Sequence, residues 1–102
     1  QGLPQAAYAS SKAGIIGLTR DLAAQWTGRK NIRVNALAPG FFPSEMSDEL
    51  PKDMVNMIKM FTPAGRLGDP EELAATLIWL VSDASSYVTG ITVPVDGGLV
   101  MP

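Results

Sequence analysis

The sequence predicts an α/β fold with a parallel sheet, and two observations lead to this prediction. Helical and extended patterns alternate in the order helix, strand, irregular excursion, helix, strand, which is typical of parallel sheets. The first strand follows the first helix after a short connection, as in the second half of a βαβ unit. Two strands and three helices would leave sheet edges and faces bare, since a parallel pair needs cover on both faces. We therefore expect these 102 residues to be a fragment of a larger, doubly wound domain.

Composition restricts the chemistry that the chain can perform. Hydrophobic residues make up 46% of the sequence and charged residues 18%, which indicates a globular protein. There is no cysteine and no histidine, so disulfides, thiolate or imidazole metal ligands and a Ser-His-Asp triad are excluded. Any proton transfer must use Tyr, Lys, Asp or Glu, and we expect no metal site.

Charge and hydropathy indicate which partners to expect. The formal net charge is -2 and no basic run occurs, so nothing predicts binding to nucleic acid or to an anionic membrane surface. No apolar run reaches the roughly 20 residues that a membrane span needs. The first residues also lack the features of a signal peptide, and we expect a cytoplasmic protein without a membrane partner.

The first helix is predicted over residues 6–27, with Gly28 as its C-terminal stop. Tyr8 and Lys12 are four residues apart and therefore share one face of this helix. A lysine cation close to a tyrosine favours the phenolate and lowers the pKa of the phenol. The pair is a candidate general acid/base near neutral pH, although a solvated pair with no function has the same spacing.

A second face of the same helix carries small side chains: Ser10, Ala13, Gly14 and Gly17. Small residues let a partner helix or strand approach closely. Because a glycine inside a helix costs about 1 kcal/mol relative to alanine, close packing is one explanation and simple tolerance is the other.

The first strand is predicted over residues 31–38 and ends at Pro39-Gly40. Residues 41–63 then form a long excursion with a short helix near residues 52–60. This excursion contains four of the five methionines and all three phenylalanines of the chain. Methionine adapts to irregular apolar surfaces, and long segments of this kind are often binding loops. The alternative is an ordinary loop with a helix that faces the core.

The last helix is predicted to begin at Asp69-Pro70 and to run to Val81. Asp69 is a good cap, Pro70 suits the first helical position, and Glu72 completes a capping box. Its apolar stripe consists of Leu73, Leu77, Leu80 and Val81. A last strand follows at residues 91–95, in which Pro94 belongs at an end or an edge because it has no N–H group.

Five segments, in this order, resemble the C-terminal part of a short-chain dehydrogenase/reductase. Tyr8-Ala9-Ser10-Ser11-Lys12 is similar to the Tyr-x-x-x-Lys motif of that family, and the other four segments are residues 13–20, 31–40, 65–74 and 90–98. The resemblance implies the C-terminal portion of a Rossmann-like doubly wound parallel sheet. Residues 1–102 would then belong to a single NAD(P)-binding domain whose N-terminal, cofactor-binding half is absent.

The resemblance also implies an activity and a site. Hydride passes between a nicotinamide cofactor (NAD or NADP) and a small-molecule carbonyl or alcohol, with Tyr8 as proton donor or acceptor. Lys12 lowers the pKa of the phenol and binds the nicotinamide ribose. The implied cofactor contacts are Tyr8, Lys12, Pro39, Gly40, Phe42 and Ser44, the last at a position usually held by Thr. Residues 41–63 match the substrate-binding loop or lid, with substrate contacts at Phe41, Met46, Met54 and Met57.

Several parts of the family's site have no counterpart in the sequence. The glycine-rich phosphate fingerprint, the catalytic serine and the catalytic asparagine are missing, and Ser10 and Ser11 do not replace that serine. We therefore expect the 102 residues alone to be inactive. The alternative is a non-catalytic, self-associating α/β module left by truncation or proteolysis. The resemblance further implies a homodimer or homotetramer formed through the 6–27 helix and the C-terminal helix and strand.

Overall fold

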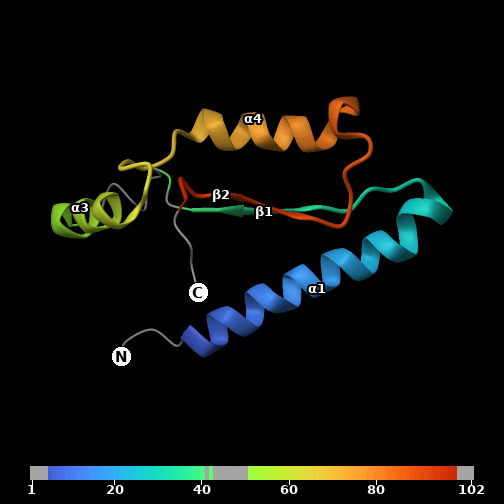
Figure 1. Ribbon diagram of the computed structural model, residues 1–102, viewed down its shortest axis with the longest axis horizontal. Helices are drawn as coiled ribbons and strands as arrows, with labels where there is room; N and C mark the ends of the chain where they lie inside the picture. Colours follow the sequence, from blue (N-terminus) through green and yellow to red (C-terminus); the bar gives the residue numbers. More distant parts are fainter. Residues whose placement is uncertain (1–4, 41, 43–50, 99–102) are drawn as a thin grey trace.

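The structure is a computed structural model that describes residues 5–40, 42 and 51–98, with side chains of the first helix described from Ser10 onward. Figure 1 shows the elements in chain order. They are α1 (Gln5–Lys30), β1 (Ala36–Pro39), α3 (Lys52–Phe61), α4 (Pro70–Val81), a 3-10 helix η1 (Asp83–Ser85) and β2 (Thr92–Val95).

The two strands form a parallel pair, which confirms the predicted α/β class. Leu37 of β1 lies opposite Val93 of β2, and Ala38 lies opposite Pro94. Pro94 is exposed and lies on a strand with one described neighbour, as its missing N–H group requires. Helices α1 and α4 lie on opposite sides of the pair (Figure 1), so both faces of the sheet receive cover.

Helix α1 is longer than the sequence predicts, and the prediction that Gly28 ends it is wrong. The helix runs to Lys30. Asn31 then takes a left-handed backbone conformation with φ of 56°, and its N–H donates to the carbonyl of Thr27 at 3.0 Å. Asparagine tolerates this conformation better than most residues and can end a helix in place of glycine. Gly28 therefore lies within the last turn.

Strand β1 is shorter than predicted, because only Ala36–Pro39 joins the ladder. The preceding residues are held mainly by side chains. The Arg33 guanidinium donates to the carbonyls of Ser85 at 2.8 Å and Val88 at 3.1 Å, and the amide of Asn35 donates to Val88 O at 3.0 Å. These bonds tie the approach to β1 to the segment between α4 and β2. Bonds from a charged donor are among the stronger ones in proteins.

The start of α4 confirms the predicted capping box. The Asp69 carboxylate accepts from Glu71 N at 3.0 Å, and the Glu72 carboxylate accepts from Asp69 N at 2.9 Å. Pro70 occupies the first helical position, where its missing N–H group costs nothing.

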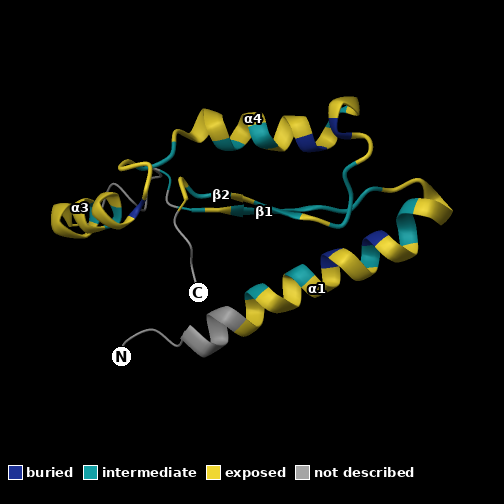
Figure 2. Cartoon of the chain, in the orientation of Figure 1, coloured by how far each residue is buried: buried dark blue, intermediate teal, exposed yellow. Residues whose placement is uncertain are grey.

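Little of the apolar surface is enclosed within the part of the chain that the structure describes. Among these residues, the buried hydrophobic side chains are Ala23 and Leu80. The stripe predicted for α4 is only partly covered, since Leu77 is 51% exposed and Val81 72% exposed. Figure 2 shows the exposed residues along both long helices. The sheet and its two helices therefore leave apolar surface exposed.

Candidate active site

A cavity of about 230 Å³ lies between α1 and the two strands, and Lys12 reaches it. Among the described residues that line it, Lys12 is the one that carries a charge. The remaining lining is mostly apolar and consists of Ser11, Ile15, Ile16, Ala36, Leu37, Ala38, Pro39 and Thr92. Lys12 itself is half-buried. A cation beside an apolar wall near the carboxyl end of a parallel strand is placed to bind an oxygen-bearing ligand, because ligands of open α/β sheets bind at that end.

The other turns of α1 hold Lys12 in this position. Thr19 and Ala23 are buried on the same side of the helix. A Cβ built on Gly90 would lie 3.3 Å from the Cβ of Ala23, so the chain before β2 passes close to the helix. Near the C-terminal end, the Thr27 hydroxyl hydrogen-bonds the Thr89 hydroxyl at 2.9 Å. These contacts hold the helix against the strands and thereby set the position of Lys12 along the strand direction.

The turn after β1 brings further predicted residues to the carboxyl end of the sheet. Gly40 N donates to Val95 O at 2.8 Å. A Cβ on Gly40 would lie 2.8 Å from the Cα of Asp96, closer than real Cβ atoms approach, so only glycine fits here. Phe42 lines a second, smaller cavity of about 100 Å³. Its ring occupies the space that a side chain on Gly68 would need.

The structure brings some of the predicted site residues together and leaves others apart. Lys12 and Pro39 line one cavity, with Gly40 next along the chain. Met54 and Met57 lie on α3 with 47% and 57% exposure, and neither lines the cavity of Lys12. Tyr8 lies on α1 one turn before Lys12, but its side chain lies outside the described part. Phe41, Ser44 and Met46 also lie outside the described residues.

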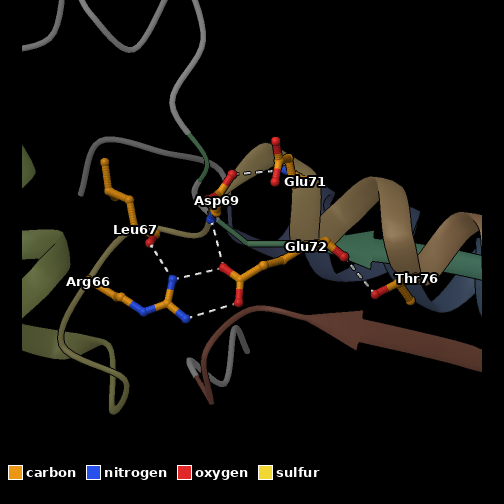
Figure 3. A network of polar contacts seen from close by, with 6 residues as sticks. All are labelled: Arg66, Leu67, Asp69, Glu71, Glu72 and Thr76. Carbon is orange, nitrogen blue, oxygen red and sulfur yellow. Dashed lines mark hydrogen bonds and ion pairs between the residues drawn. The ribbon is translucent and has the colours of Figure 1, made fainter.

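Sequence reasoning missed the ion pair between Arg66, in the turn after α3, and Glu72, at the start of α4 (Figure 3). The Arg66 guanidinium donates to both carboxylate oxygens of Glu72, at 2.8 and 3.0 Å, and to Leu67 O at 3.2 Å. The two side chains are 57% and 49% exposed. The hydrogen bond from Arg66 and the bond from Asp69 N lower the pKa of Glu72 to about 2. The same pairing raises the pKa of Arg66. Arg66 and Glu72 are six residues apart across a turn, where no helix or strand periodicity applies. The sequence pattern therefore does not reveal the pair.

We expect the Glu72 carboxyl group to titrate with a midpoint near pH 2, which NMR of its carboxyl carbon would measure. Since this pKa lies below the ordinary glutamate value of about 4.3, the ionised side chain stabilises the folded state at higher pH. That contribution is lost as the pH falls through the folded-state pKa. Arg66→Met should raise the midpoint part of the way, because Asp69 N still donates. An unchanged midpoint would show that Arg66 is not the cause.

The described part of the chain contains neither a metal-binding cluster nor a membrane-spanning helix. No group of three or more acidic side chains there could hold a metal ion. No helix in the same residues is both long enough and apolar enough to cross a membrane.

Comparison with known proteins assigns the family. A family model described as enoyl-(acyl carrier protein) reductase matches residues 2–100. The 3-oxoacyl-[acyl-carrier-protein] reductase FabG of Thermotoga maritima is 50% identical over 97 residues, which is 95% of this chain. The chain belongs to the short-chain dehydrogenase/reductase family. This confirms the resemblance carried by the Tyr8–Lys12 motif and the four later segments.

Other members of the short-chain dehydrogenase/reductase family show the same likeness. The (3R)-3-hydroxyacyl-CoA dehydrogenase of Homo sapiens is 46% identical over 95% of this chain. A crystal structure of the 3-oxoacyl-[acyl-carrier protein] reductase from Brucella melitensis matches with a TM-score of 0.85 and 45% identity over 93% of this chain. The chain spans 39% of the Thermotoga protein, 37% of the human protein and 35% of the Brucella chain. The parallel pair with its helices is thus part of a Rossmann-like fold.

Proposed function

We propose that the complete gene product is an NAD(P)-dependent oxidoreductase that interconverts a carbonyl and an alcohol. The observation that carries the proposal is the position of Lys12, half-buried at the cavity beneath β1 and one helical turn after Tyr8. Membership of the family supports the same reaction class, because relatives with 44–50% identity are named as reductases or dehydrogenases.

Tyr8 and Lys12 are the proposed catalytic residues. In reduction the Tyr8 hydroxyl donates its proton to the carbonyl oxygen, and in oxidation the phenolate takes the proton from the alcohol. Lys12 supplies the cation that favours the phenolate. Residues 41–63, and within them Phe41, Met46, Met54 and Met57, are the proposed substrate contacts.

The described residues fit one end of a nicotinamide cofactor. Lys12 offers three N–H donors in the lining of a cavity that Pro39 also lines, which suits the hydroxyl groups of a ribose. Gly40, Phe42 and Ser44 complete the proposed cofactor contacts. When bound, the cofactor supplies the hydride. No G-x-G-x-x-G run occurs in the 102 residues, so they offer no such cradle for the pyrophosphate.

We propose a 3-oxoacyl or 3-hydroxyacyl thioester as the substrate class, because the named relatives act on this pair of compounds. The test is the absorbance of the reduced nicotinamide, followed with the complete gene product and a 3-oxoacyl thioester. We expect turnover with the thioester and none with the 102 residues alone. No turnover with any carbonyl compound would refute the proposal.

A self-associating, non-catalytic module is the second candidate, and the exposed apolar residues of α4 favour it. Intact mass and size-exclusion chromatography distinguish the two: oligomers near 10.8 kDa per chain without turnover favour the module. The cytoplasmic location and the homodimer or homotetramer expected from the sequence remain predictions.

A further inference from the structure

The chain between β1 and α4 leaves and returns at one place, the end of β2. At the start of this connection, Gly40 N donates to Val95 O at 2.8 Å. At its end, Ala64 N donates to Gly97 O at 3.0 Å. Both ends are therefore attached within residues 95–97, one to the last residue of β2 and the other to the turn that follows it.

The returning end is packed tightly enough to require glycine in the turn. Gly97 has φ of 63°, and a Cβ there would lie 2.9 Å from the Thr62 Cγ2 atom. Gly98 has φ of 92°, and a Cβ there would lie 3.1 Å from Pro63. The positive φ disfavours a residue with a Cβ at both positions, and at Gly97 the Cβ would also lie closer to Thr62 than real Cβ atoms approach. The turn thus fixes the position at which the chain comes back from α3.

Within the described residues, helix α3 has few other attachments. None of its residues is buried, and it lies beyond the end of the sheet toward which both strands run (Figure 1). Thr62, which follows it directly, is buried and donates to Ile58 O through its N–H at 3.0 Å and its hydroxyl at 2.7 Å. Among the described residues, the contacts that set the direction of α3 therefore lie at its C-terminal end.

We propose that Arg66 and Glu72 are positioning residues that set where α3 stands relative to the carboxyl end of the sheet. Glu72 belongs to α4, which covers one face of the sheet. Arg66 belongs to the turn that follows α3 and donates two hydrogen bonds to the Glu72 carboxylate (Figure 3). The pair therefore attaches the turn after α3 to α4. Its bidentate geometry restrains the orientation of the two side chains as well as the distance between them.

This inference rests on the proposed function, because α3 carries the two described methionines assigned to substrate contact, Met54 and Met57. Loss of the pair should make α3 more mobile and weaken substrate binding, while Lys12 keeps its position. A rise in KM at constant kcat indicates loss of an interaction that stabilises the bound substrate and the transition state equally.

Two glutamates side by side offer a matched comparison in the complete gene product. Glu72→Gln keeps an oxygen for Asp69 N but removes the charge that Arg66 grips. Glu71→Gln removes one charge from the same helical turn, where negative charge interacts with the helix dipole, and its side chain is no partner of Arg66. Arg66→Lys keeps the positive charge and removes the two-pronged geometry.

We expect Glu72→Gln to speed hydrogen exchange in residues 52–61 and to raise the KM for the carbonyl substrate, each by about 2- to 5-fold, the range of an exposed ion pair. Exchange in residues 92–95, kcat and the KM for the cofactor should stay unchanged. Arg66→Lys should show a smaller change in the same direction, and Glu71→Gln none.

Equal effects of Glu71→Gln and Glu72→Gln would overturn the inference, and so would exchange that rises equally in residues 92–95, since that result indicates general destabilisation. If the complete gene product reduces no carbonyl compound, the proposed function fails. The exchange comparison then decides alone: a difference confined to residues 52–61 supports the positioning role, and its absence refutes it.

Discussion

Tyr8→Phe is expected to lower kcat of the complete gene product by about 10²- to 10⁴-fold, the contribution usual for a general acid or base. Phenylalanine keeps the ring and removes only the hydroxyl group that exchanges the proton. Cofactor affinity should therefore change little. Steady-state assays with the carbonyl substrate and a separate cofactor-binding titration would measure the two effects.

The chain offers a matched control for this substitution, because it has one other tyrosine. Tyr87 lies after η1 and is fully exposed, far along the chain from the candidate site. Tyr87→Phe removes the same hydroxyl group and should leave kcat unchanged. Full activity in Tyr8→Phe would refute the assignment of Tyr8 as the proton donor.

Lys12→Met is expected to damage both turnover and cofactor binding. Methionine keeps an unbranched apolar stem in the cavity that Ile16 and Pro39 also line, but it removes the cation and its N–H donors. A hydrogen bond from a charged group contributes about 1.5–3 kcal/mol, so the KM for the cofactor should rise by roughly 10- to 100-fold. The kcat should fall as well, because the phenolate loses the cation that favours it.

The pH dependence separates these two effects of Lys12. Without the cation, alcohol oxidation should require a higher pH, since the base must still lose its proton. Lys30→Met is the matched control: it removes a lysine from the exposed end of the same helix, outside the lining of the cavity. A Lys12 variant with the unaltered pH profile and cofactor KM would contradict both roles.

The sequence predicted the elements better than their limits. Apolar spacing correctly predicted α3 and α4, and the Asp69–Glu72 capping box fixed the start of α4. Strand β1 was predicted too long, because alternation of polar and apolar residues does not tell a ladder from a segment held by side chains. Arg33 and Asn35 bond to carbonyls more than 50 residues away, which no local pattern encodes.

From residue spacing alone, without the family resemblance, the candidate site was predictable only where its residues lie close together in the sequence. The four-residue spacing of Tyr8 and Lys12 follows from helix geometry, and α1 confirms that both lie on one helix. That Lys12 shares a cavity with Pro39 depends on how the helix packs against the sheet. The Arg66–Glu72 pair depends on a turn geometry that composition does not reveal.

The pairing of β1 with β2 has a consequence for the order of folding. The bond from Ile91 N to the Asn35 side chain joins residues 56 positions apart, and the ladder joins residues equally distant. The chain must close this large loop, at a cost in entropy, before any strand contact forms. Local structure such as α4 with its capping box can form first, whereas non-local pairing of parallel strands is intrinsically slow. The strand ends that frame the candidate site are therefore expected to be among the last parts of this region to form.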